Sequence, residues 1–419
     1  MFKRLKGMKD IFKKEAVILE YIKASFFKIA TNYNFDFIET PLLEDINLFV
    51  RSSGEMSDIV SKEMYHFKDN SGKEIALRPE GTASAIRAFV ENKINNLENS
   101  KLFYFGPMFR HERPQKGRFR QFNQGGVEII ENKSINANFE IIKLALDFLH
   151  AIKISDFTLE INNLGSMETR TKYIKVLKDY FTLHQNELSE ISKQRLEKNV
   201  LRILDDKDES KKTFVKNAPK LIDYLSKEEL HDFNELLNKL NDFNIKYKLN
   251  PYLVRGLDYY NDVVFEFVSN SEALGSKSTI LAGGRYDGMI NSFGGPNLGS
   301  IGFAFGVERL LEIINFNFDK YEELVENNLI LIAFLNEEEE QEILKIAYEL
   351  RKSFKVKLIN SKINIKQLFK LQYKYNPRYL IFKELNSKNN EIKVKTFKSE
   401  KSIVYNGNDN FQNQIRELE

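Results

Sequence analysis

The sequence predicts an α/β multidomain protein, in which strand-rich sequence is split by a helical insertion and followed by a further α/β domain. Three features of the 419-residue chain support this prediction. Apolar runs with strand-like alternation lie on both sides of residues 167–247, which instead repeat leucine, lysine and glutamate with helical spacing. Residues 329–419 alternate strand and helix patterns, as α/β domains do. A chain of this length is expected to contain about two to four domains.

The composition excludes several kinds of site. The chain has no cysteine, so it cannot form a disulfide, an iron–sulfur site or a thiolate zinc site. Its five histidines lie far apart and form no HExxH motif, which argues against a histidine metal site. The first residues are charged and no run of about 18 apolar residues occurs, so we expect a soluble, cytoplasmic protein without a membrane segment.

The first elements are a helix and an edge strand. Residues Lys13–Thr31 place Ile18 and Ile22 on one apolar stripe, which predicts an amphipathic helix. Residues Phe35–Asp45 are typical of a strand, and Pro41 confines that point to an edge or an end. This edge could pair with a partner chain, or it could be an ordinary surface edge.

A polar cluster, Arg78-Pro-Glu80-Gly-Thr82, follows at a predicted strand-to-helix junction. Residues 64–69 and 74–82 are predicted to be strands joined by a turn at 70–72, and Thr82 is expected to cap a helix over 83–90. Such junctions often carry ligand contacts. The alternative is a purely structural helix cap.

The most informative stretch is Phe103–Ile130, which predicts a β-hairpin with a basic turn. In the second strand, alternation sends Phe122, Gln124, Gly126 and Glu128 to one face. This row could be the floor of a site for a small ligand with amine or imidazole donors. The turn, residues 110–120, carries five cationic residues and one acid, which suits phosphate. The alternative is an ordinary hairpin with a solvated turn.

A helical segment interrupts the strand-rich part. Residues 138–151 predict an amphipathic helix and residues 157–166 a strand, and glycine is then absent from Met167 to Tyr247. The leucine periodicity of that stretch predicts an inserted helical domain. We interpret it as a bundle without chemistry of its own.

Glycine returns in three stretches that are predicted to be strands or turns with close backbone approaches: Tyr252–Phe267, Thr279–Ile290 and Asn297–Ile314. In the last, a strand passes through Gly306 into a helix and places Arg309 in its first turn, where a cation opposes the helix dipole. Function is one reason for that placement, and compensation by Glu308 is the other.

The last part of the chain predicts a separate α/β domain with a mostly parallel sheet and a final helix. A linker is expected near residues 317–328. Residues 329–419 contain 17 Lys and Arg against 12 Asp and Glu, an excess that the rest of the chain does not share.

Neither a GxxxxGK[ST] loop nor a strand-GxGxxG-helix pattern occurs, so any bound phosphate would be held by arginines such as Arg110, Arg118 and Arg309. Five motifs then resemble, in order, those of the bacterial histidyl-tRNA synthetase family of class II aminoacyl-tRNA synthetases: RPEGT at 78–82, GPMFRHERPQKGRFRQF at 106–122, LVRGLDYY at 253–260, AGGRYDG at 282–288 and GFAFGVERLL at 302–311.

The resemblance implies a class II antiparallel sheet flanked by helices and a histidine–tRNA ligase that uses ATP with Mg²⁺. It implies catalytic roles for Arg255, Arg110 and Glu80. It implies histidine contacts by Glu80, Thr82, Gln124, Glu128, Tyr259, Tyr260 and Tyr286, and ATP contacts by Arg110, Glu112, Arg118, Phe122 and Arg309. The acceptor end of tRNA(His) would meet Arg113, Gln115 and Arg120. No protein ligand for a metal is assigned. A side chain at Gly126 would occupy space that histidine needs.

The same resemblance implies a catalytic core over residues 1–166 and 248–320, a helical insertion over 167–247 and an anticodon-binding domain over 329–419. It also implies a homodimer with the Phe35–Pro41 region at its interface. One departure from the family is Gly125, which is expected to loosen its strand. The alternatives are a non-catalytic regulatory subunit of ATP phosphoribosyltransferase, which generally lacks the last domain and the motif arginines, and a class II synthetase for another amino acid.

Overall fold

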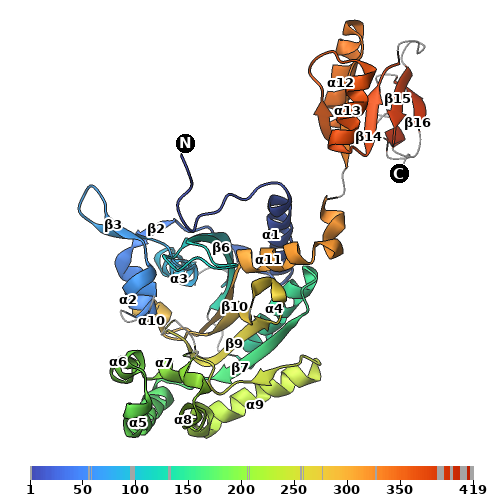
Figure 1. The fold of residues 1–419 in the computed structure, drawn as a ribbon. Helices are drawn as coiled ribbons and strands as arrows, with labels where there is room; N and C mark the ends of the chain where they lie inside the picture. Colours follow the sequence, from blue (N-terminus) through green and yellow to red (C-terminus); the bar gives the residue numbers. More distant parts are fainter. Residues whose placement is uncertain are drawn as a thin grey trace. The chain divides into compact units, whose positions relative to one another are not determined.

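The computed structural model describes residues 2–54, 57, 59–94, 100–130, 134–204, 206, 208–254, 257, 259–275, 277–325, 328–384, 391–396, 400–405 and 413–415. The chain forms two compact units, Met1–Tyr321 and Glu322–Glu419. Figure 1 shows the elements of each unit along the chain. Among the helices in these ranges, none is long and apolar enough to cross a membrane.

The first unit is built on an eight-stranded sheet. Its order is β1 (Asp36–Phe37), β5 (Lys101–Phe109), β6 (Gln121–Ile130), β11 (Ser300–Gly306), β10 (Ser278–Arg285), β9 (Asn261–Ser269), β7 (Phe157–Asn163) and β8 (Lys248–Leu249). The inner pairs are antiparallel, and the outermost pairs, β1 with β5 and β7 with β8, are parallel. The predicted antiparallel sheet is confirmed.

Helices cover one face of this sheet. They are α1 (Lys14–Asn32), α4 (Ile135–Ala151) and α11 (Val307–Phe316), and all three confirm predicted helices. Phe26 of α1, Phe148 of α4 and Phe305 of β11 meet with ring centres 4.6 to 5.2 Å apart. Such edge-to-face and tilted aromatic contacts fix the helices against the sheet.

A smaller sheet stands beside the first one. It has the order β2 (Leu43–Asp45), β4 (Glu74–Leu77), β3 (His66–Lys68), and it carries α2 (Ile46–Ser53) and α3 (Thr82–Glu91). The predicted strand over Phe35–Asp45 is two short strands, β1 and β2, which end on either side of Pro41 because proline cannot donate to a sheet ladder. The predicted turn at 70–72 is confirmed.

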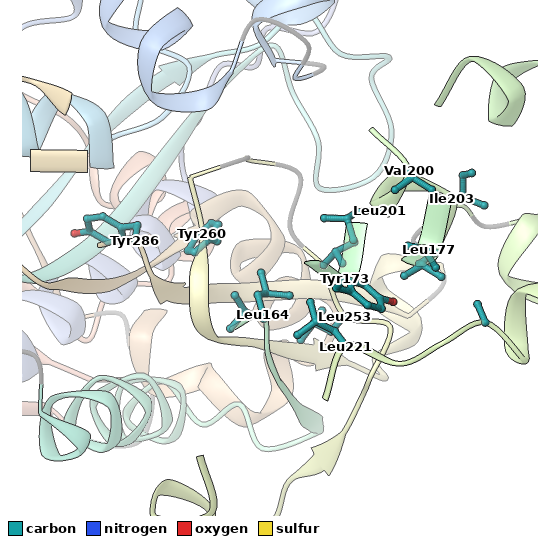
Figure 2. Packing of buried hydrophobic residues seen from close by; sticks show 14 of the residues in the cluster. Leu164, Tyr173, Leu177, Val200, Leu201, Ile203, Leu221, Leu253, Tyr260 and Tyr286 are labelled. Carbon is teal, nitrogen blue, oxygen red and sulfur yellow. The ribbon is translucent and has the colours of Figure 1, made fainter. Parts of the chain in front are cut away.

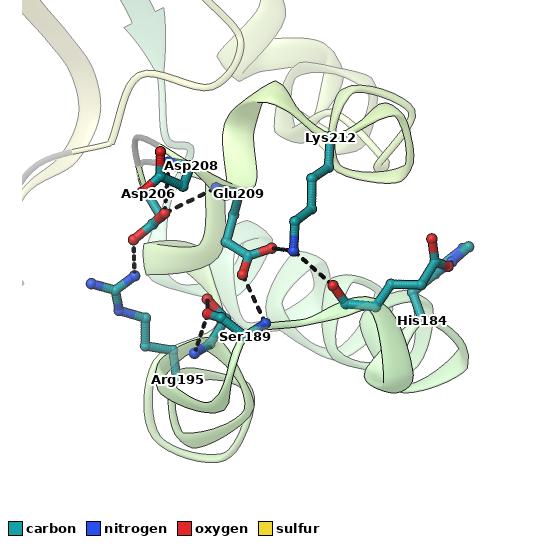
Figure 3. A network of polar contacts seen from close by, with 9 residues as sticks. His184, Ser189, Arg195, Asp206, Asp208, Glu209 and Lys212 are labelled. Atoms are coloured by element: carbon teal, nitrogen blue, oxygen red, sulfur yellow. Dashed lines mark hydrogen bonds and ion pairs between the residues drawn. The ribbon is translucent and has the colours of Figure 1, made fainter.

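The helical segment contains α5 (Met167–Leu183), α6 (Glu190–Lys198), α7 (Leu201–Leu204), α8 (Thr213–Lys216) and α9 (Lys227–Asp242). Its first and last helices are joined by Glu229, whose carboxylate accepts hydrogen bonds of 2.7 Å from the amides of Ser166 and Ser226. A second polar network, around Glu209 and Arg195, holds the shorter turns (Figure 3). These acceptors define the ends of the helices.

The helical segment shares its apolar core with the strands. Tyr173 and Leu177 of α5 belong to the same buried cluster as Leu253 and, farther along, Tyr260 and Tyr286 (Figure 2). The segment is therefore packed into the first unit through a core that it shares with the strands.

The second unit has a five-stranded sheet in the order β13 (Lys355–Leu358), β12 (Leu329–Ile332), β14 (Tyr379–Phe382), β15 (Glu391–Lys395), β16 (Glu400–Val404). The prediction of a mostly parallel sheet is wrong, because β14–β15 and β15–β16 pair antiparallel. Helices α12 (Glu340–Leu350) and α13 (Ile365–Tyr375) pack on opposite faces. Of the predicted final helix, the structure describes only residues 413–415.

The predicted linker near 317–328 coincides with the boundary between the units. It contains a 3₁₀ segment, Phe318–Val325. Within it Tyr321 is buried and donates a hydrogen bond of 2.8 Å to the carbonyl oxygen of Ile152. The linker therefore begins only after a residue that is anchored in the first unit.

Candidate active site

The site lies on the face of the large sheet opposite α1 and α4. In β6 the side chains alternate as predicted: Gly125 faces the helices, where the ring of Phe305 fills the space that its missing side chain leaves. Gln124 and Glu128 point to the other face and are buried. The predicted alternation is confirmed, and it places Gln124 and Glu128 together as a buried polar row.

Gly126 makes room for a neighbouring aromatic ring. It pairs with Tyr104 across the β5–β6 ladder, so both face the site. A β-carbon at Gly126 would lie 2.4 Å from the Tyr104 hydroxyl oxygen and 2.9 Å from the carbonyl oxygen of Phe303. The space above Gly126 thus belongs to the phenol ring of Tyr104, a site residue that the sequence analysis missed.

Glu128 is the deepest acid of the floor, with 1% of its surface exposed. Its Oε2 accepts a hydrogen bond of 2.5 Å from the Tyr286 hydroxyl. Among the described residues, its Oε1 has no hydrogen-bond partner. Burial raises the pKa of Glu128 to about 8, although the hydrogen bond from Tyr286 and the nearby hydroxyls of Thr82 and Tyr104 work in the opposite direction. An acceptor oxygen without a partner at this depth is suited to a donor group of a ligand.

Glu80 organises the start of α3, next to Gln124. Its carboxylate accepts hydrogen bonds from the backbone amides of Thr82 at 2.7 Å and Ala83 at 2.9 Å. The expectation that Thr82 caps the helix is wrong: Thr82 is the first residue of α3, and the side chain of Glu80 satisfies the free amides. Gln124 closes the same corner, where its Oε1 accepts from the amide of Gly81 at 2.8 Å.

Four tyrosines lie near these acids. The Tyr259 ring centre lies 4.6 Å from that of Tyr260 and 5.8 Å from that of Tyr286. The Tyr104 hydroxyl lies 3.4 Å from the hydroxyl of Thr82. Burial raises the pKa of Tyr104, Tyr259 and Tyr286 well above that of an ordinary phenol, so they act as neutral hydrogen-bonding groups.

The predicted phosphate arginines gather where the strands end. Arg110 donates from Nε to the carbonyl oxygen of Pro79 at 2.8 Å, and its guanidinium carbon lies 5.4 Å from the ring centre of Phe122. Arg118 forms an ion pair with Glu112 at 3.2 Å. These contacts leave both guanidinium groups with further donors.

Arg309 reaches the same end from α11. Its guanidinium donates to the carbonyl oxygen of Thr279. Burial, followed by the nearby charge of Arg118, lowers the pKa of Arg309 to about 10. Glu308 does not compensate its charge through a bond to it, because the Glu308 carboxylate accepts from the backbone and side-chain amides of Asn123 at 2.9 to 3.0 Å. The three arginines thus form a cationic end that suits an anionic ligand.

The remaining predicted residues differ in their surroundings. Arg113 and Gln115 are exposed in the turn, whereas Arg120 is half-buried and donates to the carbonyl oxygen of Glu112 at 3.4 Å. Arg255 lies outside the described residues. Within the described ranges, no group of three acids or histidines could hold a metal ion.

The arrangement therefore has two chemically different ends on one strand pair. One end is buried and offers carboxylates and phenols to a small ligand with several N–H donors. The other end offers arginines and an aromatic ring to a phosphorylated, planar ligand.

Comparisons with known proteins identify a family that this chain resembles. A family model described as histidyl-tRNA synthetase matches residues 7–310. The curated histidine–tRNA ligase of Mycoplasmopsis pulmonis is 47% identical over 414 residues, which cover 98% of this chain and 97% of the relative. The one from Ureaplasma parvum serovar 3 is 43% identical over 430 residues, covering 100% and 98%.

Among solved structures, apo histidyl-tRNA synthetase from S. aureus aligns with a TM-score of 0.78 at 30% identity, covering 96% of this chain and 97% of the other. A family model over most of the chain and relatives above 40% identity at nearly full length leave one assignment. This chain belongs to the histidyl-tRNA synthetase family.

Proposed function

We propose that this protein is a histidine–tRNA ligase, which activates L-histidine with ATP and transfers the histidyl group to the 3′ end of tRNA(His). The single observation that carries the proposal is Glu128, a buried acid with one acceptor oxygen that has no partner among the described residues. Arg110 and Arg118, on the same hairpin, keep donors for phosphates. Activation of histidine needs a buried oxygen that accepts a hydrogen bond from the imidazole, close to groups that bind phosphate.

Histidine is proposed to lie between Glu80 and Glu128. Glu128 and Tyr260 would hydrogen-bond the two imidazole nitrogens, and a ligand without ring nitrogens would leave these groups unpaired, which gives specificity. Glu80, Thr82 and Gln124 would hold the amino and carboxylate groups. Tyr259, Tyr286 and, from its position over Gly126, Tyr104 would complete the pocket.

ATP is proposed to lie over the cationic end. Arg110 and Arg118 would bind phosphates, Arg309 and Phe122 would enclose the adenine, and Glu112 would contact it. Arg255 is proposed to bind the α-phosphate opposite Arg110. Mg²⁺ would enter bound to the nucleotide, since the described side chains include no cluster of acids that fits a metal, and Mg²⁺ commonly keeps phosphate and water ligands.

The reaction then proceeds in two displacements. A carboxylate oxygen of histidine attacks the α-phosphorus, the bond to the β-phosphate oxygen breaks, and pyrophosphate leaves. The 3′-hydroxyl of the terminal adenosine then attacks the carbonyl carbon, and AMP leaves. Both steps depend mainly on orientation and on neutralising charge, which the arginines supply, and need no nucleophile from the protein.

The domain roles are part of the proposal. Residues 1–166 and 248–320 would form the catalytic core around the helical insertion 167–247, with residues 329–419 binding the anticodon. The excess of basic residues after Leu329 supports contact with RNA phosphates. Arg113, Gln115 and the charged end of Arg120 would meet the acceptor end. The protein is further proposed to be a cytoplasmic homodimer. Its interface would include the Phe35–Pro41 region.

The test is exchange of labelled pyrophosphate into ATP by the purified protein, with each amino acid in turn. Histidine alone should support exchange, and only tRNA(His) should be charged. Glu128→Ala should weaken histidine at least about tenfold more than ATP. Absence of histidine-dependent exchange would reject the ligase assignment and favour a non-catalytic regulatory subunit.

A further inference from the structure

The segment Gly7–Lys9, which precedes α1, lies against the base of the arginine-rich turn. The amide of Arg120 donates to the carbonyl oxygen of Gly7 at 2.8 Å, and the amide of Arg110 donates to the carbonyl oxygen of Arg120 at 2.9 Å. A row of backbone hydrogen bonds therefore runs from Gly7 through Arg120 to Arg110.

Gly7 is adapted to this contact in two ways. Its φ of 83° lies in the left-handed region, which side chains other than glycine rarely adopt. A β-carbon at this position would also lie 2.7 Å from Cγ and 2.8 Å from Cδ of Arg120. Any other residue would both strain the segment and push Arg120 away.

Lys9 joins the turn to two helices. Its Nζ lies 2.8 Å from Oε1 of Glu15 in α1 and 3.5 Å from Oε1 of Glu312 in α11. It also lies 5.3 Å from the ring centre of Phe119, the neighbour of Arg120. Only 19% of the Lys9 side chain is exposed, so these contacts are weakly screened by solvent.

The second strand is tied to the same helix. Glu308, in the first turn of α11, accepts from both amides of Asn123 in β6. Helix α11 also carries Arg309. Helix α11 thus contacts the start of β6 through Glu308 and the end of the turn through Lys9. The same helix carries Arg309.

We propose that Gly7 and Lys9 are positioning residues for the nucleotide end of the site. They set the spacing between Arg110, which follows β5, and Arg309, which belongs to α11. The inference rests on the proposed ligase function, and it assigns to a segment outside the five motifs a role in binding ATP. The hydrogen bonds that hold Glu80, Gln124 and Glu128 in the described structure come from other residues, so the histidine end should be unaffected.

The experiment compares Gly7→Ala, Lys9→Met and Lys9→Arg in the full-length protein. Histidine-dependent pyrophosphate exchange gives KM for ATP and for histidine, and thermal unfolding is recorded for each variant. Gly7→Ala and Lys9→Met should raise KM for ATP roughly tenfold and leave KM for histidine within about twofold. Lys9→Arg should recover most of the ATP effect, because arginine keeps the charge and the contact with the ring.

Lys6→Met is the matched control, since Lys6 directly precedes this segment and is exposed. It should behave as the unchanged protein, and the same rise in KM for ATP in Lys6→Met would overturn the proposal. A parallel rise of both KM values, or no change in Gly7→Ala and Lys9→Met, would also overturn it. Failure of the unchanged protein to show any exchange would reject the ligase function itself, which is a distinct result.

Discussion

Glu128→Gln is expected to make the substrate-free protein more stable at high pH while it weakens histidine binding. Glu128 is almost fully buried, and burial raises its pKa to about 8. The folded protein therefore holds the proton more tightly than the unfolded chain does. Stability from this group is complete below the unfolded pKa and is lost as the pH rises through the folded pKa.

The size of the effect follows from the difference between the folded and unfolded pKa of this carboxyl group. Between about pH 6 and about pH 9 the unchanged protein should lose up to roughly 3 kcal/mol of unfolding free energy through Glu128. The Glu128→Gln variant should not show this loss, because an amide does not titrate. For a unit of this size, that difference corresponds to a shift of several degrees, on the order of five, in the unfolding midpoint. Glu128→Gln is expected to raise the unfolding free energy at high pH because Glu128 is an ionisable residue held in an unfavourable, buried environment.

The assay is thermal unfolding of both proteins across that pH range without ligands, followed by KM for histidine. Glu229→Gln is the control, because the pKa of Glu229 is lowered to about 2 and its carboxylate accepts backbone hydrogen bonds. The Glu229→Gln control should lower the unfolding midpoint by the same amount at both ends of this pH range. Equal midpoints for Glu128→Gln and the unchanged protein at high pH would refute the reasoning.

Three further outcomes are expected. Gly126→Ala should displace the ring of Tyr104, lower the unfolding midpoint by an amount equivalent to about 1–3 kcal/mol, and raise KM for histidine, whereas a neutral effect would mean that the ring can move freely. Arg170→Ala removes a donor that lies 2.9 Å from the carbonyl oxygen of Tyr260, so KM for histidine should rise several-fold in exchange assays, while Lys172→Ala on the same helix should not change it. A chain that ends before Leu329 should keep most histidine-dependent exchange and lose most tRNA charging, and an equal loss of both would exclude a specific RNA role for the second unit.

The buried polar row of β6 was predictable from the sequence because strand alternation is a local property. The period of two fixes which side chains of β6 share a face, so Gln124 and Glu128 could be placed together without knowing what they meet. Tyr104 could not be placed in that way. Its position over Gly126 depends on the register between β5 and β6, and a long turn does not fix the register.

Two other errors had signals that were present in the chain. The connection at residues 383–390 is shorter than the dozen or so residues that a parallel crossover needs, so an antiparallel β14–β15 pair was predictable. The helix cap was assigned to Thr82 because threonine is a common capping residue. Glu80 serves instead, because its longer side chain reaches forward from outside the helix to the amides of Thr82 and Ala83.

The apolar core that the helical segment shares with the strands determines how substitutions in that segment affect the rest of the first unit. Tyr173 and Leu177 of α5 lie in one continuous apolar cluster with Tyr260 and Tyr286, which line the proposed amino-acid pocket. Close-packed interiors transmit changes in volume, so a smaller or larger side chain in α5 is expected to shift the rings of Tyr260 and Tyr286. Substitutions in this segment are therefore expected to alter discrimination between histidine and similar amino acids. A different helical segment inserted at this place would have to pack against Tyr260 and Tyr286 in the same way.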